Sequence, residues 1–210
     1  MHCVFPKGGY IDDQKSKKAL FFTSLRNHYL ASYFNHHGSH HKTGGRSEQG
    51  STISKHHFHF DASGSMKGQI GGRGKTDIAK DVLIKLIEDL PAGINVGLVS
   101  YGHRRKGDCN DVEELAPLAK LNKQDLIDKI RALKPKGKTP ISHSVELTAE
   151  KLQALEEETT IVLVSDGKET CGGDPCKLVK KLKESGIKFV MHVIGFDVTP
   201  EKKTAAGMHC

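Results

Sequence analysis

The stretch TIVLVSDG, residues 160–167, decides the fold, because a short apolar, β-branched run leads directly into Asp166 and a glycine. Two other runs have the same character: INVGLVSY at residues 94–101 and KFVMHVIGF at residues 188–196. Near-continuous apolarity over so few residues is typical of strands that are buried on both faces. The sequence therefore predicts a parallel sheet that is covered on both sides.

Helical patterns lie between these runs. Residues 76–90 place apolar side chains on one stripe, and a Pro-Ala-Gly stop follows. Residues 123–133, 141–155 and 175–185 show further helical patterns, and residues 57–60 and 112–115 are expected to be a first strand and an edge strand. Strands that alternate with helices predict an α/β fold, with a doubly wound, mostly parallel sheet flanked by helices.

The first 60 residues differ in composition from the rest. They carry 8 Lys+Arg and 3 Asp+Glu, against 24 and 22 in the remainder, and 9 of the 13 histidines. We therefore expect residues 1–56 to be a low-complexity, disordered extension and residues 57–210 to be the folded domain. The cluster His36, His37, His40 and His41 is interpreted as opportunistic metal chelation, since nothing around it would fix the rings.

Composition also bears on partners and location. The net charge of +7 belongs mostly to the extension, and few aromatic residues follow it, so nucleic-acid binding is not expected. No apolar segment approaches the roughly twenty residues that a transmembrane helix needs. The apolar patch at residues 19–34 is only faintly like a signal peptide, which leaves the localisation open.

Oxygen-bearing side chains gather where the expected strands end. Asp61, Ser63 and Ser65 follow the first strand, Asp166 follows the strand that ends at residue 165, and Thr139 precedes a helix. In doubly wound sheets these positions meet at the carboxyl edge. Oxygen donors without His or Cys suit Mg²⁺, with Mn²⁺ or Ca²⁺ as alternatives. Hydroxyl ligands would leave such an ion electrophilic.

DASGSM at residues 61–66, Thr139 within KGKTP, and LVSDG at residues 163–167 resemble the von Willebrand factor type A domain and its metal-ion-dependent adhesion site. The resemblance covers residues 57 to about 207. YGHRRKGDCND, SDGKETC and HVIGFDVT are similar to bacterial stand-alone members of this family.

That resemblance implies a Rossmann-like fold and a metal bound by the hydroxyls of Ser63, Ser65 and Thr139. Asp61 and Asp166 would act directly or through water, and an Asp or Glu of a partner protein would complete the shell. The implied function is non-enzymatic adhesion or complex assembly, and the implied location is exported or periplasmic.

The chain departs from the family pattern in two places. The first strand reads HHFHF where the family has an apolar strand, and burying each unpartnered histidine would cost about 1–3 kcal/mol. The sequence ends at Cys210, where the family continues through a further helix and strand, so we expect the domain to be truncated at its C-terminus.

Rival functions use the same residues. Asp61 could be the phospho-acceptor of a phosphotransfer enzyme, with Lys138 or Lys168 as its charge partner, although Ser63 stands where a second Asp is usual. The chain could also be an accessory subunit of a metal-chelatase or ATPase complex. GGRGKT at residues 71–76 lacks the first glycine of a phosphate-binding loop. A catalytic triad could be drawn only on paper, from Ser65, Asp166 and either His103 or His143.

The cysteines and one basic loop leave further alternatives open. Cys109, Cys171, Cys176 and Cys210 are either free thiols or disulfides, and Cys171 with Cys176 could close a small loop in an oxidising compartment. Residues 104–106, Arg-Arg-Lys, are either a solvated loop or charges that steer an acidic partner.

Overall fold

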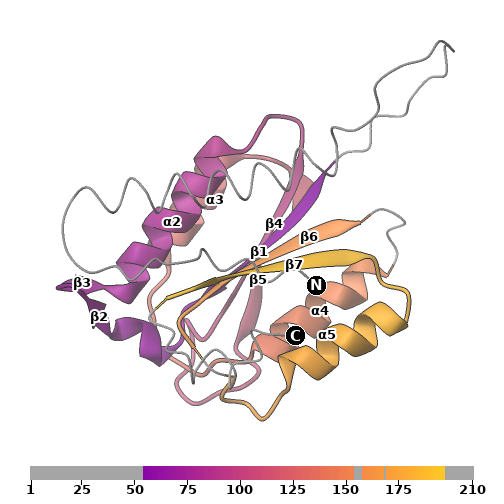
Figure 1. Ribbon diagram of the computed structural model, residues 1–210. Helices are drawn as coiled ribbons and strands as arrows, with labels where there is room; N and C mark the ends of the chain where they lie inside the picture. Colours follow the sequence, from indigo (N-terminus) through magenta and orange to yellow (C-terminus); the bar gives the residue numbers. More distant parts are fainter. Residues whose placement is uncertain (1–53, 154–157, 168, 197–210) are drawn as a thin grey trace, which may run out of the picture. The chain divides into compact units, whose positions relative to one another are not determined.

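The computed structural model describes residues 54–153, 158–167 and 169–196. Across them, five strands form one sheet in the order β5-β4-β1-β6-β7 (Figure 1). The strands are β1 (Lys55–Asp61), β4 (Asn95–Tyr101), β5 (Val112–Lys120), β6 (Thr159–Ser165) and β7 (Phe189–Gly195). Only β5 is antiparallel to its neighbour, so the doubly wound, mostly parallel sheet expected from the sequence is confirmed.

Helices cover both faces of this sheet. Figure 1 shows α2 (Lys75–Asp89) and α3 (Lys123–Ala132) on one face, and α4 (Ile141–Leu152) and α5 (Pro175–Glu184) on the other. All four were predicted, with bounds that differ by at most three residues. None of the described helices is long and apolar enough to cross a membrane.

The central strand β1 carries the HHFHF sequence, and its alternation sorts the side chains. Successive residues of a strand point to opposite faces, so Phe58 and Phe60 share one face and the histidines His57 and His59 the other. Phe58 and Phe60 are fully buried. Buried His56 shares the face of Phe58 and Phe60, so neither face of the strand is apolar throughout.

The histidines His57 and His59 differ in how well they are accommodated. His59 is fully buried, and its ring nitrogens lie 3.2 Å from Ser144 Oγ and 3.0 Å from Thr148 Oγ1, both on α4. These contacts offset the expected cost. His57 Nδ1 is buried without a hydrogen-bond partner, so the cost remains there. Gly97 makes room for this ring, since a Cβ at that position would lie 2.6 Å from His57 Cε1.

Short elements after β1 were not predicted. Residues Gly64–Lys67 form a 3-10 turn, η1, and β2 (Gln69–Ile70) pairs with β3 (Arg73–Gly74) in a two-stranded hairpin. Gly71 and Gly72 adopt positive φ values of 55° and 76° at its tip. The GGRGKT segment is therefore a hairpin turn followed by a helix, without the preceding sheet strand that a phosphate-binding loop needs.

Two predicted strands were too short. The first strand begins at Lys55 instead of residue 57, and the edge strand continues to Lys120 instead of residue 115. Pro117 and the exposed charges of β5 fit an edge position, because an edge strand pairs on one side only. The N-terminal extension, the histidine cluster at residues 36–41 and the C-terminal end lie outside the described residues.

Candidate metal centre

The candidate site lies where the order of the strands in the sheet reverses, between β1 and β6. β1 and β6 are neighbours in the sheet. From β1 the chain continues to β4 on one side, whereas from β6 it continues to β7 on the other side. Two such neighbouring strands leave a crevice at their carboxyl ends. Asp61 is the last residue of β1, and Asp166 follows the last residue of β6. The topology therefore brings both candidate carboxylates to the same crevice.

Asp61 is fully buried, and both of its oxygens accept hydrogen bonds. The Ser63 backbone N–H donates to Oδ1 at 2.8 Å, and the Ser165 hydroxyl donates to Oδ2 at 2.5 Å. Burial raises the pKa of Asp61 to about 6, and nearby Asp166 adds to this, although the hydrogen bonds oppose it. A buried carboxylate that is held only by neutral donors remains attractive to a cation.

The hydroxyls of the DASGS segment connect the two carboxylates. Ser63 Oγ lies 3.0 Å from Ser65 Oγ, and Ser65 Oγ donates to Asp166 Oδ1 at 2.7 Å. The turn η1 allows this, because it starts directly after Ser63 and brings Ser65 back over the crevice. Four of the five predicted ligands, Asp61, Ser63, Ser65 and Asp166, thus lie in one continuous polar cluster.

The segment that carries Thr139, the fifth predicted ligand, is joined to the Ser63–Gly64 segment by backbone contacts of Gly137. Thr139 is buried and lies in the segment before α4. Ser63 bridges to Gly137, and the Gly64 N–H donates to the Gly137 carbonyl at 2.8 Å. The Thr170 hydroxyl accepts the Thr139 N–H at 2.8 Å, which attaches this segment to the loop after β6.

Two glycines permit this close meeting of loops. Gly102 has φ of 70°, and a Cβ there would lie 2.4 Å from the Lys138 carbonyl oxygen and 3.0 Å from Ser63 Cα. A Cβ at Gly137 would lie 2.3 Å from the Arg105 carbonyl oxygen. A side chain at either position would push the loops apart.

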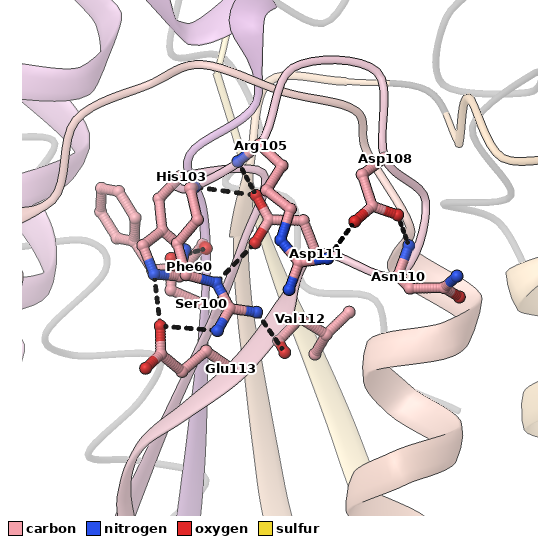
Figure 2. A network of polar contacts seen from close by, with 10 residues as sticks. Phe60, Ser100, His103, Arg105, Asp108, Asn110, Asp111, Val112 and Glu113 are labelled. Atoms are coloured by element: carbon pink, nitrogen blue, oxygen red, sulfur yellow. Dashed lines mark hydrogen bonds and ion pairs between the residues drawn. The ribbon is translucent and has the colours of Figure 1, made fainter.

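Asp111 organises the loop between β4 and β5, as Figure 2 shows. Asp111 Oδ2 accepts the backbone N–H groups of Arg104 and Arg105 at 2.8 Å, and its Oδ1 accepts Arg104 Nε at 2.7 Å. Arg105 also pairs with Asp108 at 2.8 Å. Both arginines are therefore used within the loop, and of the three basic residues only Lys106 shows no ion pair among the described residues.

A disulfide joins this loop to the segment after Asp166. Cys109 is bonded to Cys171, 62 residues further along the chain. The hypothesis of a small loop closed by Cys171 and Cys176 is therefore wrong, because the Cys171 sulfur already has a partner. Glu169 supports the same segment, since its carboxylate accepts the N–H of Cys171 at 2.7 Å and that of Ser142 at 2.8 Å.

Sequence reasoning missed Lys75. Its Nζ donates to Asp166 Oδ2 at 2.8 Å, and the two side chains are only 10% and 3% exposed. The one available signal was the GRGKT segment, which was considered only as a phosphate-binding loop. The lysine instead places its ammonium beside a candidate metal ligand.

The donors present suit a hard divalent cation. The candidate donors are two carboxylates and three hydroxyls, which suit such an ion. Among the described residues no group of three or more His, Cys, Asp or Glu could hold a metal ion. The Lys75 ammonium at Asp166 shows that this crevice already attracts positive charge. The residues thus fit Mg²⁺, Mn²⁺ or Ca²⁺.

The residues considered for the enzymatic rivals are engaged in other contacts or exposed. His103 Nε2 lies 2.8 Å from Glu113, and Ser65 donates to Asp166, so no serine–histidine pair is formed there. Asp61 is fully buried, and its two oxygens accept hydrogen bonds from the Ser63 N–H and the Ser165 hydroxyl. Lys138 is exposed, and Lys168 lies outside the described residues.

Comparison with known proteins identifies relatives. The sequence model of the von Willebrand factor type A domain family matches residues 57–208 of this chain. The uncharacterized protein YwmD of Bacillus subtilis is 33% identical over 147 residues, which cover 66% of this chain and 66% of YwmD. The chain therefore spans just under two thirds of the length of that relative.

Solved structures share the fold. Proximal thread matrix protein 1 from the mussel byssus, described with a zinc-occupied MIDAS motif, matches with a TM-score of 0.54 and 20% identity over 68% of this chain and 35% of that one. The manganese-loaded TRAP protein of Plasmodium vivax matches with a TM-score of 0.55 and 19% identity over 74% and 63%. At such identities the likeness establishes the fold.

Proposed function

Because the chain belongs to the von Willebrand factor type A family, we propose that it is a non-enzymatic protein-binding module whose bound divalent cation accepts an acidic residue of a partner protein. The family is known for metal-dependent adhesion and protein binding. The proposal adds to that general role a specific set of ligands and a specific chemistry of recognition.

The proposed ligands are Asp61, Ser63, Ser65, Thr139 and Asp166. The observation that carries this assignment is the Ser65 hydroxyl, which lies between Ser63 and Asp166 and so joins the two strand ends. When bound, the cation would supply a Lewis-acidic position for an external carboxylate. We propose Mg²⁺ as the native ion, with Mn²⁺ or Ca²⁺ as alternatives, because Mg²⁺ keeps exchangeable waters in such sites. The zinc and manganese in the descriptions of the two structural relatives support a divalent cation in general.

The charge around the site supports an acidic partner. Lys67 follows Ser65 in η1, and Lys136 and Lys138 lie in the segment that contacts Ser63; all three side chains are exposed. None of the three forms an ion pair with another described residue. Exposed cations around a metal site favour encounter with an acidic surface and raise the association rate more than the final affinity.

We further propose that residues 57–210 form the binding domain and that the protein works in an oxidising compartment. The Cys109–Cys171 disulfide supports this location, because such bonds persist mainly outside the reducing cytosol.

Thermal denaturation with and without metal tests the proposed site. Millimolar Mg²⁺ or Mn²⁺ should raise the melting temperature relative to EDTA, since a ligand at about 100 times its Kd stabilises by roughly 2.7 kcal/mol. Asp61→Ala and Ser65→Ala should abolish the increase. Asp128→Ala, on the exposed face of α3, is the matched control and should retain it. A wild-type protein that shows no metal-dependent shift would contradict the proposal.

The phosphotransfer alternative has its own test. Incubation with acetyl phosphate and Mg²⁺, followed by intact-protein mass spectrometry, should show no phosphate adduct. A stoichiometric adduct that Asp61→Asn removes would favour the enzyme over the binding module.

A further inference from the structure

We propose that Lys75 is a built-in competitor of the divalent cation: its ammonium stabilises the metal-free site and lowers the affinity of the site for metal. This inference rests on the proposed metal site, but it concerns a residue outside the five proposed ligands.

The contact is specific and buried. Lys75 is the first residue of α2, and its Nζ donates to Asp166 Oδ2 at 2.8 Å. The other oxygen of that carboxylate, Oδ1, accepts the Ser65 hydroxyl at 2.7 Å. One carboxylate thus connects the ammonium directly to a proposed hydroxyl ligand.

The chain makes room for the lysine in spite of two opposing effects. A positive charge in the first turn of a helix is disfavoured by the helix dipole, and a buried ammonium loses its hydration. Gly68 lies against the stem, because a Cβ there would be 3.2 Å from Lys75 Cε, and the Lys75 N–H donates to the Gly68 carbonyl at 2.8 Å. The backbone is therefore shaped to direct this side chain into the crevice.

The charges explain what the lysine does in the absence of metal. Asp61 and Asp166 share one crevice, and Asp61 is held by neutral donors only. Without Lys75 these groups carry a charge of −2 when ionised, and the ammonium reduces it to −1. Lys75 therefore keeps Asp166 in place, against repulsion from Asp61, while no cation is bound.

The same charge acts against the metal. An incoming cation must share Asp166 with the ammonium or displace it, and at close range in a partly buried site the repulsion is strong. With both cations present the site carries +1, which favours an anionic ligand. Lys75 therefore lowers the affinity of the site for the metal and strengthens the attraction of the metal-bound site for an acidic partner.

Mn²⁺ binding to purified variants tests this competition, with free Mn²⁺ followed by electron paramagnetic resonance. Lys75→Met removes the charge from a stem of similar length, and Lys75→Gln keeps a hydrogen-bond donor so that the fold is retained if the methionine variant is unstable. Both should bind Mn²⁺ at least tenfold more tightly than the wild type, and both should melt at a lower temperature in EDTA. Lys75→Arg should stay within a few-fold of the wild type.

Lys85→Met is the matched control, because Lys85 lies on the same helix, about 15 Å further along, and pairs with Asp89. It should leave the Mn²⁺ affinity unchanged. If the wild type binds Mn²⁺ but Lys75→Gln and Lys75→Met bind it equally or more weakly, the competition is refuted while the metal site stands. If no variant binds Mn²⁺, both proposals fail. Binding by the neutral variants alone would support the competition in its strongest form.

Discussion

Acid should destabilise the protein through two of the three histidines of the central strand, His57 and His59. Burial lowers the pKa of His57 from 6.5 to about 4, and the pKa of His59 to about 3, with His57 adding to the latter effect. Both folded-state values lie below the unfolded value, so the unfolded chain takes up protons first as the pH falls. The contribution of each histidine to stability is complete above pH 6.5 and is lost as the pH falls toward the folded-state pKa.

The size of the effect follows from these pKa values. Between pH 7 and pH 5, each histidine should remove about 2 kcal/mol from the free energy of unfolding. Asp61 acts in the opposite sense, because burial raises its pKa from 3.8 to about 6. Its contribution to stability is fully present below pH 3.8 and is lost as the pH rises through 6. When the pH falls from 7 to 5, Asp61 therefore adds about 1 kcal/mol to the free energy of unfolding. The net loss should be about 2 to 3 kcal/mol.

Urea denaturation in EDTA at pH 7, 6 and 5 measures this loss directly. His59→Gln keeps an amide for Ser144 and Thr148 but cannot take up a proton, so its loss between pH 7 and pH 5 should be smaller by about 2 kcal/mol. Asp61→Asn should instead lose about 1 kcal/mol more than the wild type. His143→Gln, at a partly exposed position on α4, is the matched control.

A wild-type protein that is equally stable at pH 5 and pH 7 would refute the reasoning. So would a His59→Gln variant whose dependence on pH matched the wild type, because its ring would then not be the group that takes up the proton.

Three further predictions concern packing and covalent links. Replacing Cys109 and Cys171 with serine should lower the free energy of unfolding by up to about 4 kcal/mol, the loop-entropy value for a closed loop of this length, and urea denaturation with and without reductant would check it. Gly97→Ala should destabilise by about 1–3 kcal/mol, because the methyl would overlap the His57 ring, whereas Ala92→Gly in the exposed turn after α2 should change little; thermal denaturation would compare them. Gly102→Ala should reduce the metal-induced increase in melting temperature, because the new Cβ would force the Lys138 segment away from Ser63, and an undiminished increase would show that the loops tolerate the displacement.

The strands and helices were predictable because each was marked by a local pattern. The stripe of α2 has a helical period, and the run at residues 160–165 is short, β-branched and apolar almost throughout. The edge strand β5 was underestimated because Pro117 and its charges weaken the pattern of an element that is buried on one side only. The short η1 and the β2–β3 hairpin have too few residues to show a period.

Some residues of the candidate site could likewise be predicted from the sequence, and others could not. Asp61, Ser63 and Ser65 share one segment, and Asp166 follows a recognisable strand, so the topology alone placed them together. Lys75 could not be found, because its contact spans 91 residues and depends on Gly68 leaving space for the stem. The Cys109–Cys171 pair also required the fold, since the nearer cysteine, Cys176, was the more obvious partner in the sequence.

The neighbouring positions of β1 and β6 have a consequence for the order of events during synthesis. Asp61 and Asp166 meet only when two strands about a hundred residues apart in the chain have paired. Contacts of such long sequence separation form late, because the loop between them must first be closed. A nascent chain that has not yet released β6 from the ribosome therefore lacks Asp166, although the other four proposed ligands precede this strand. On the proposed assignment, the cation has its full set of ligands only in a domain in which β1 and β6 have paired.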